Sequence, residues 1–188
     1  MTDAVATLRR DPDLGPIVER VGPVDIEPHP DPFRRLVVSI VRQQLSMASA
    51  RSIRERLFDA VEPTPEAVLA ADPDRLADTG LSTAKVEAVR AAARAHREHD
   101  WPAAFEGRSD RAVQAALTDV RGIGPWTAKM YLIFALGRED VFPVEDLGIR
   151  RAMERLFDDP TRAEMRSIAE RWSPYRSYAA RYLWALED

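Results

Sequence analysis

Residues Leu117–Ile149 read LTDVRGIGPWTAKMYLIFALGREDVFPVEDLGI, and this stretch decides the fold. It begins as a helix, turns at Gly122-Ile123-Gly124 and continues as a second helix from Pro125, a residue favoured at the first helical position. Between Pro125 and Leu136 the only charged residue is Lys129. The pattern therefore predicts a helix that is apolar nearly all round and runs through the core.

The turn between these two helices has two interpretations. Glycines permit backbone conformations and close approaches that a side chain would block. Backbone amides at the start of a helix point outward, so such a turn can bind a phosphate without a basic side chain. An ordinary helix–turn–helix connection would have the same Gly-x-Gly sequence, and the turn alone leaves both interpretations open.

The rest of the chain also predicts helices. Strand-like alternation of period two is missing, whereas helix-start signals recur. A capping residue precedes proline at positions 11–12, 31–32, 64–65, 72–73 and 173–174, and Thr161-x-x-Glu164 has the form of a capping box. We therefore expect an all-α protein.

Two further helices have a recognisable apolar side. The first has a stripe that continues to Gln44, where a polar side chain ends the buried face, and the second is expected to start near Ser173. The stripe of the first helix is Phe33, Leu36, Val37, Ile40 and Val41, and that of the second is Tyr175, Tyr178, Ala179, Tyr182 and Leu186.

Composition excludes several kinds of chemistry. The 188 residues include no cysteine, so disulfides, iron–sulfur clusters, thiolate zinc sites and cysteine nucleophiles are ruled out. The three histidines have no metal-ligand spacing with carboxylates, and we expect no metal catalysis. No apolar run approaches the roughly 18 residues of a membrane span, and the first residues do not resemble a signal peptide, so we expect a cytoplasmic protein without membrane contact.

Charge is unevenly distributed along the chain. The net charge is −4, which argues against nonspecific binding of polyanions if the charges are evenly spread. Residues 31–60, however, carry six arginines against three acidic residues. A basic patch on an acidic protein therefore remains compatible with the sequence. Around the turn that follows the helix of the Phe33–Val41 stripe lie Arg34, Arg35, Arg42 and Arg51.

Four blocks in order give the chain a family resemblance. They are PFRRLVVSIVRQQLSMASA, LSTAKVEAVRAAA, VRGIGPWTAKMYLIFALGREDVFPVEDLGIRRA and AERWSPYRSYAARYLW. The chain resembles the helix-hairpin-helix glycosylases of base excision repair, of the DNA-3-methyladenine glycosylase II type. The resemblance implies a two-lobed all-α fold without an N-terminal sheet domain, as one glycosylase domain over residues 1–188. Its lobes would be 31–136, including the hairpin 117–136, and 1–30 with 146–188.

The resemblance also assigns roles to residues. Asp146 falls on the catalytic aspartate, although without the family it would simply be the N-cap of the following helix. Gln44 falls on the residue that fills the gap left by an extruded nucleotide, with Leu45 beside it. The base pocket would be formed by Trp126, Met130 and Trp172, and the contacts to the DNA strand by Gly122, Ile123, Gly124 and Thr127.

The implied reaction is hydrolysis of alkylated purines of the 3-methyladenine and 7-methylguanine type in duplex DNA. Trp126 stands where the lyases of this superfamily have a lysine, so no Schiff base is expected. No cofactor is required, but Na⁺ or K⁺ is expected on the carbonyls of Thr118, Val120 and Gly122. We expect a monomer associated with a prokaryotic nucleoid. The alternatives are a noncatalytic protein that binds DNA or abasic sites, and a glycosylase of oxidised or deaminated bases.

Overall fold

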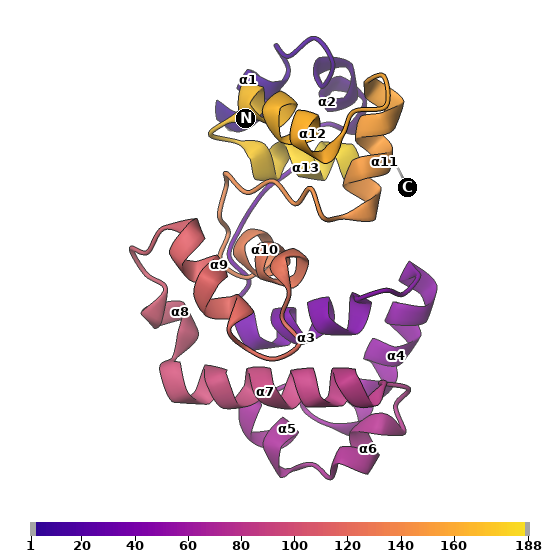
Figure 1. Ribbon diagram of the computed structural model, residues 1–188, viewed down its shortest axis with the longest axis vertical. Helices are drawn as coiled ribbons and strands as arrows, with labels where there is room; N and C mark the ends of the chain where they lie inside the picture. Colours follow the sequence, from indigo (N-terminus) through magenta and orange to yellow (C-terminus); the bar gives the residue numbers. More distant parts are fainter. Residues whose placement is uncertain (1–2, 187–188) are drawn as a thin grey trace. The chain divides into compact units, whose positions relative to one another are not determined.

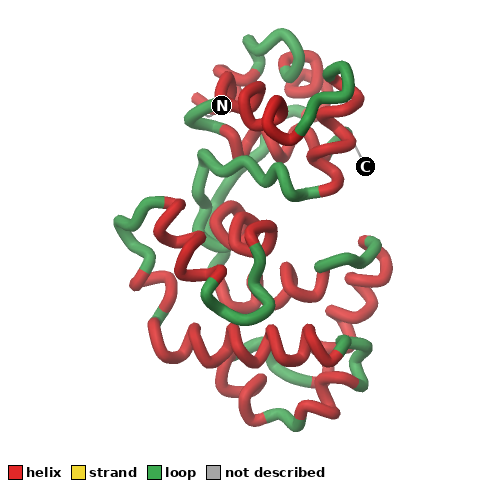
Figure 2. Tube along the Cα trace, viewed as in Figure 1, coloured by secondary structure: helices red, strands yellow, loops and turns green. Residues whose placement is uncertain are grey.

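The computed structural model describes residues 3–186, which form helices joined by loops and turns, without a strand among them (Figures 1 and 2). This confirms the all-α prediction. The α-helices are α1 (Asp3–Leu8), α2 (Gly15–Val21), α3 (Pro32–Arg42), α4 (Met47–Ala60), α5 (Pro65–Ala70), α6 (Pro73–Ala77), α7 (Thr83–His99), α8 (Trp101–Ala104), α9 (Asp110–Thr118), α10 (Pro125–Phe134), α11 (Leu147–Leu156), α12 (Arg162–Ala169) and α13 (Arg176–Trp184), and a 3₁₀ helix, η1, spans Glu170–Trp172.

The chain divides into two compact units. Unit 1 joins Met1–Glu27 to Gly137–Asp188, and unit 2 is Pro28–Leu136. The lobes expected from the sequence have slightly different ends, since they left residues 137–145 in neither lobe. In the structure this loop, which leads to Asp146, belongs to unit 1. Among residues 3–186, no helix has both the length and the apolar character needed to cross a bilayer.

Helix α10 forms the centre of unit 2. It packs against α3 and α9, and α3 packs in turn against α7 (Figure 1). The predicted core helix is confirmed, because six of its ten residues are buried. The predicted stripe of α3 is buried as well, from Phe33 to Val41. Burial of these two helices against each other brings the turns that follow α3 and precede α10 into the same region of unit 2.

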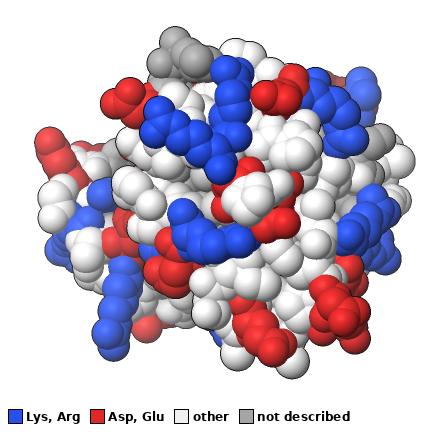
Figure 3. Space-filling model, turned by 90° about the horizontal axis from the view of Figure 1, so that it is seen from above, with Lys and Arg blue, Asp and Glu red and all other residues white. Residues whose placement is uncertain are grey.

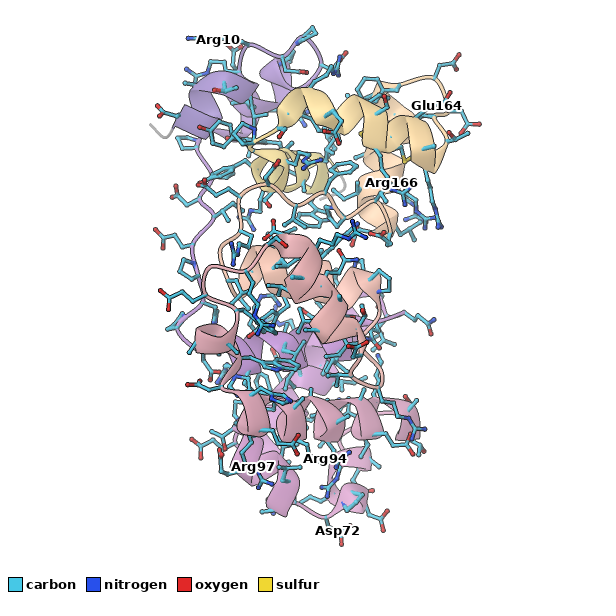
Figure 4. All side chains as sticks on the ribbon, turned by 60° about the vertical axis from the view of Figure 1, so that its left-hand side comes forward. Arg10, Asp72, Arg94, Arg97, Glu164 and Arg166 are labelled. Carbon is cyan, nitrogen blue, oxygen red and sulfur yellow. The ribbon has the colours of Figure 1, made fainter. Side chains whose placement is uncertain are left out.

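Most of the predicted helix starts are confirmed. Asp31, Thr64 and Asp72 accept hydrogen bonds from first-turn amides of α3, α5 and α6. The capping box of α12 is present between Thr161 and Glu164, the latter labelled in Figure 4.

Two predicted starts are wrong. Asp11 caps a turn, where its Oδ1 accepts from the amides of Asp13 and Leu14, and α2 starts only at Gly15. Ser173 donates its hydroxyl to Asp140 Oδ2 at 3.0 Å, so it does not cap a helix. The Ser173-Pro174 peptide bond is cis, and α13 begins at Arg176.

Helix α13 forms the centre of unit 1. Its residues 177–180, 182 and 183 are buried, and it packs against α1, α2, α11 and η1. The Tyr182 hydroxyl donates to the carbonyl oxygen of Gly22 at 3.1 Å, which joins α13 to the end of α2. This helix is therefore the element against which α1, α2, α11 and η1 of unit 1 pack.

A cluster of aromatic rings in unit 2 surrounds a histidine. The imidazole of His96 lies 5.4 Å from the ring of Phe33 and 6.1 Å from that of Trp101, measured between centroids. Its Nε2 atom is buried without a hydrogen-bond partner among the described residues. Burial lowers the pKa of His96, although the carboxylates of Asp100, Asp31 and Glu66 act in the opposite direction.

The pH dependence of folding tests this environment. Unfolded histidine has a pKa of about 6.5, so below that pH the unfolded chain takes up a proton before the folded chain does. The stabilisation is complete above the unfolded pKa and is lost as pH falls toward the folded pKa, at no more than about 1.4 kcal/mol per pH unit. We expect His96→Phe to lose less stability than the parent between pH 7 and pH 5 in urea unfolding. Equal losses in the two proteins would contradict this.

Candidate functional site

The two glycines of the hairpin differ in their surroundings. Gly122 has φ +86°, and a Cβ atom there would overlap Ala88 Cβ and lie 3.0 Å from Ala88 Cα on α7. Gly124 precedes α10 with an extended backbone and open space where its Cβ would be. Ile123 between them is 4% exposed. Gly122 therefore lets the hairpin lie against α7, and Gly124 leaves the start of α10 open.

The start of α10 has no side-chain cap. Helix N-termini carry unpaired amide donors and the positive end of the helix dipole. Pro125 has no amide hydrogen, and the donors of the first turn are supplied by the residues after it. This arrangement suits an anion such as a backbone phosphate.

Gln43 ties the hairpin to α3. Its side-chain Nε2 donates to the carbonyl oxygen of Gly122 at 2.9 Å and to Thr127 Oγ1 at 2.8 Å. The sequence placed Gln43 in the turn after α3 but gave it no role. Thr127 is 1% exposed, and a contact between this residue and DNA stays a prediction.

The hairpin carbonyls fit a monovalent cation. The carbonyl of Val120 accepts from the amide of Ile123 at 3.0 Å, and that of Gly122 accepts from Gln43. Each carbonyl oxygen has a second lone pair, and carbonyl oxygens are ligands that K⁺ accepts in place of water. Among residues 3–186, no group of three or more histidines and carboxylates could hold a metal ion.

The turn after α3 is the most exposed apolar part of unit 2. Gln44 has φ +55° and is exposed. Leu45 is 38% and Met47 66% exposed. Two of these residues, Gln44 and Leu45, are those expected to fill the gap left by an extruded nucleotide. The structure presents both at the surface.

Asp146 is held at the start of α11. Its Oδ1 accepts a hydrogen bond from the amide of Ile149 at 3.1 Å and another from Trp184 Nε1 at 2.9 Å. Gly148 makes room for the indole, because a Cβ there would lie 3.2 Å from Trp184 Cδ1. The carboxylate is therefore oriented by one backbone and one side-chain donor.

The neighbouring acid has a different partner. Glu145 Oε1 lies 4.0 Å from Arg166 Nη2 of α12, a residue labelled in Figure 4. The choice of Asp146 over Glu145 as the acidic site residue rests on the family resemblance. The structure adds that Asp146 caps α11 and contacts Trp184.

Helix α13 also holds the loop that leads to Asp146. The buried Ser177 hydroxyl donates to the carbonyl of Arg138 at 2.6 Å and accepts from the amide of Val141 at 3.0 Å. Arg176 makes a bidentate pair with Asp140, at 2.7 and 2.9 Å. The guanidinium of Arg176 is therefore engaged within the protein. One helix thus fixes both the loop and the carboxylate.

The three residues expected to line a base pocket lie in different environments. Trp126 is half-buried in the first turn of α10, and Met130, one turn further, is 2% exposed. Trp172 of unit 1 is 0% exposed, and its Nε1 donates to Asp11 Oδ2 at 3.0 Å. Trp172 is therefore buried in the core of unit 1, and its role as a pocket wall stays a prediction.

Trp184 is the tryptophan that the sequence reasoning missed. It ends the same block, AERWSPYRSYAARYLW, that contains Trp172. Nothing in the local pattern shows which of the two indoles reaches Asp146, because the contact spans 38 residues.

Comparisons with known proteins place the chain in a family. Residues 37–175 match the HhH-GPD superfamily of base excision DNA repair proteins, and the chain belongs to this superfamily. It is 34% identical to DNA-3-methyladenine glycosylase 1 of Schizosaccharomyces pombe, over 82% of this chain and 72% of that protein. It is also 34% identical to DNA-3-methyladenine glycosylase 2 of Escherichia coli, over 84% of this chain and 58% of that protein.

A solved structure supports the same relation. The S. pombe 3-methyladenine DNA glycosylase Mag1, in complex with abasic DNA, superposes with a TM-score of 0.86 and 31% identity. The match covers 97% of this chain and 95% of that one. The chain therefore has the all-helical fold of HhH-GPD base excision glycosylases.

The two hairpin glycines give a matched pair of variants. Gly122→Ala is expected to reduce the free energy of unfolding by at least about 2 kcal/mol, since a left-handed alanine and an overpacked contact each cost about 1–3 kcal/mol. Gly124→Ala should stay within about 1 kcal/mol of the parent because its site is open and not left-handed. Urea unfolding of both variants measures the difference. A Gly122→Ala protein as stable as Gly124→Ala would contradict the packing of the hairpin on α7.

Proposed function

We propose that this protein is a monofunctional DNA glycosylase that hydrolyses the N-glycosidic bond of alkylated purines in duplex DNA. The observation that carries the proposal is the carboxylate of Asp146, held at the N-terminus of α11 by the Ile149 amide and the Trp184 indole. The names of the relatives support the class of substrate, since two of them are DNA-3-methyladenine glycosylases.

The proposed chemistry assigns Asp146 to the sugar. As the bond between C1′ and the base nitrogen breaks, its electron pair leaves with the base and positive charge develops on the deoxyribose. A fixed carboxylate stabilises that charge and orients the attacking water. The water oxygen then bonds to C1′ and its proton is lost, which leaves an abasic site. An alkylated purine is cationic before it leaves, so little acid catalysis of departure is needed.

The hairpin would hold the DNA strand. A phosphate bound at the open start of α10 would position the backbone, with Na⁺ or K⁺ on the carbonyls of Thr118, Val120 and Gly122 adding positive charge. The target nucleotide must leave the stack at a cost of a few kcal/mol. In the proposal Trp126 offers its ring face to the base, where a cationic purine gains roughly 0.5–2 kcal/mol.

Hydrolysis without strand cleavage follows from the residue after the hairpin. A lyase of this superfamily needs an amine that forms a Schiff base with C1′, and Trp126 stands at the matching position. Lys129, the one lysine of α10, is half-buried three residues further on. The proposal therefore gives the chain no covalent DNA intermediate.

Replacing the carboxylate tests the central assignment. Asp146→Asn keeps an oxygen that accepts from Ile149 and Trp184, so the fold should persist. We expect base release from N-methylated DNA to fall by at least about 100-fold, the size of effect seen when one electrostatic group of an active site is lost. Binding to abasic duplex should change little. Chromatography of the released bases and a binding titration measure the two effects.

Glu145→Gln is the matched control and should retain activity. If Glu145→Gln loses base release while Asp146→Asn retains it, the assignment is wrong. A parent protein that binds abasic DNA but releases no base from any substrate would instead be a noncatalytic binder. Trapping of a covalent adduct by borohydride would contradict the monofunctional reaction.

Trp184→Phe tests whether the indole N–H supports Asp146. Phenylalanine keeps an aromatic ring at this half-buried position but removes the donor to Oδ1. A hydrogen bond to a charged group contributes about 1.5–3 kcal/mol, so we expect the single-turnover excision rate to fall by about tenfold or more. The Kd for abasic DNA should stay unchanged. Trp101→Phe, a buried tryptophan of unit 2, is the control, and an equal loss of rate in both variants would contradict a specific role for Trp184.

A further inference from the structure

One lysine in unit 2 holds the end of a helix. Lys85 Nζ donates to the carbonyl of Val41 at 2.7 Å and to that of Gln43 at 2.7 Å. The last carbonyls of a helix have no intrahelical partner, and a cation there also interacts favourably with the helix dipole. Burial lowers the pKa of Lys85. This partly buried ammonium thus fixes the point at which α3 ends.

The same point is joined to the hairpin. The side-chain Nε2 of Gln43 donates its two hydrogens to two acceptors, the Gly122 carbonyl oxygen and Thr127 Oγ1. The side-chain amide of Gln43 therefore donates both of its hydrogens to residues that are 79 and 84 positions away in the sequence.

Helix α7 completes the connection. Lys85 and Ala88 lie three residues apart, on the same face of α7, and Ala88 is the residue on which Gly122 packs. The end of α3, the hairpin and α7 therefore meet through Lys85, Gln43, Ala88 and Gly122. We call these four residues the joint.

The joint lies directly before the exposed turn. Gln44 follows Gln43 with a left-handed backbone, and Leu45 and Met47 continue at the surface. Left-handed backbone costs about 1–3 kcal/mol in a residue other than glycine and persists only where its surroundings hold it. Gln43, which directly precedes Gln44, is held at two points. Its side chain bonds to the hairpin, and its carbonyl oxygen accepts from Lys85.

We propose that Gln43 and Lys85 are positioning residues for nucleotide extrusion, which hold the turn of Gln44 and Leu45 at a fixed place relative to the hairpin. The inference rests on the proposed function. When the hairpin binds a DNA strand, the turn of Gln44 and Leu45 would then lie at the nucleotide step where it can fill the gap left by the extruded nucleotide. Neither residue touches the reacting atoms, so the joint acts on extrusion and not on bond cleavage.

Substrates with different extrusion costs separate these two steps. The same alkylated purine is placed opposite a complementary base or in an unpaired bulge, where leaving the stack costs less. Single-turnover excision at saturating enzyme is measured for the parent, Gln43→Ala, Lys85→Met and the control Gln114→Ala, a glutamine of α9 outside the joint. Loss of one or two hydrogen bonds should slow excision from the paired duplex by about tenfold in each joint variant.

The bulged substrate decides the outcome. We expect both joint variants to remain within about twofold of the parent there, because a residue that acts on extrusion matters less when extrusion is cheap. Equal losses on the two substrates, or no loss on the paired one, would overturn the proposal. Thermal unfolding of Gln43→Ala and Lys85→Met shows whether either is unfolded, and each variant alone suffices for the comparison.

Failure of the proposed function has a different signature. If the parent releases no base from either substrate, the same proteins are titrated with duplex containing an abasic analogue. Weaker binding by Gln43→Ala and Lys85→Met than by Gln114→Ala would still support the joint, with glycosylase activity rejected. Binding by the joint variants equal to that of Gln114→Ala would overturn the joint as well.

Discussion

Unpaired backbone groups at helix ends are the constraint on which this structure depends. A chain made only of helices leaves donors at every start and acceptors at every end. Asp146 satisfies the start of α11, and Lys85 the end of α3. The start of α10 is different, because Gly124 has no side chain with which to cap it. Asp146 and Lys85 thus satisfy helix ends, whereas the start of α10, like those of α2 and α13, has no side-chain cap.

Several arginines of this acidic protein are paired with carboxylates, which bears on how it would bind DNA in the proposed function. Arg176 pairs with Asp140 and Glu170, Arg171 with Asp13, and Arg121 with Glu87. On the face shown in Figure 3, basic and acidic side chains are interspersed. Charge neutralised within the protein cannot attract phosphates at long range. Binding in the proposed mode depends more on backbone amides and shape than on the number of basic residues.

Sequence reasoning succeeded where one short segment determines the structure. The caps at Asp31, Thr64 and Asp72 and the apolar stripe of α3 could be predicted, because each involves residues only two to four apart. It failed at Asp11 and Ser173, where a residue suited to cap a helix bonds to another partner. The family resemblance supplied the candidate acid, Asp146.

The contacts that assemble the site could not be predicted in the same way. Gln43 reaches the hairpin 79 residues away, and Lys85 reaches back 42 residues to Gln43. The contact of Trp184 with Asp146 has the same origin, since local spacing does not show which indole reaches the carboxylate. Such contacts depend on how helices pack, and one sequence gives little information about that.

The position of α13 has a consequence for protein synthesis. Asp146 leaves the ribosome well before Trp184, its partner 38 residues later. Until α13 has emerged and docked, the indole cannot contact Asp146, and Ser177 cannot contact the loop from Arg138 to Val141. A nascent or prematurely terminated chain that already contains the acid would therefore lack the support that orients it, so assembly of the site is a late event in translation.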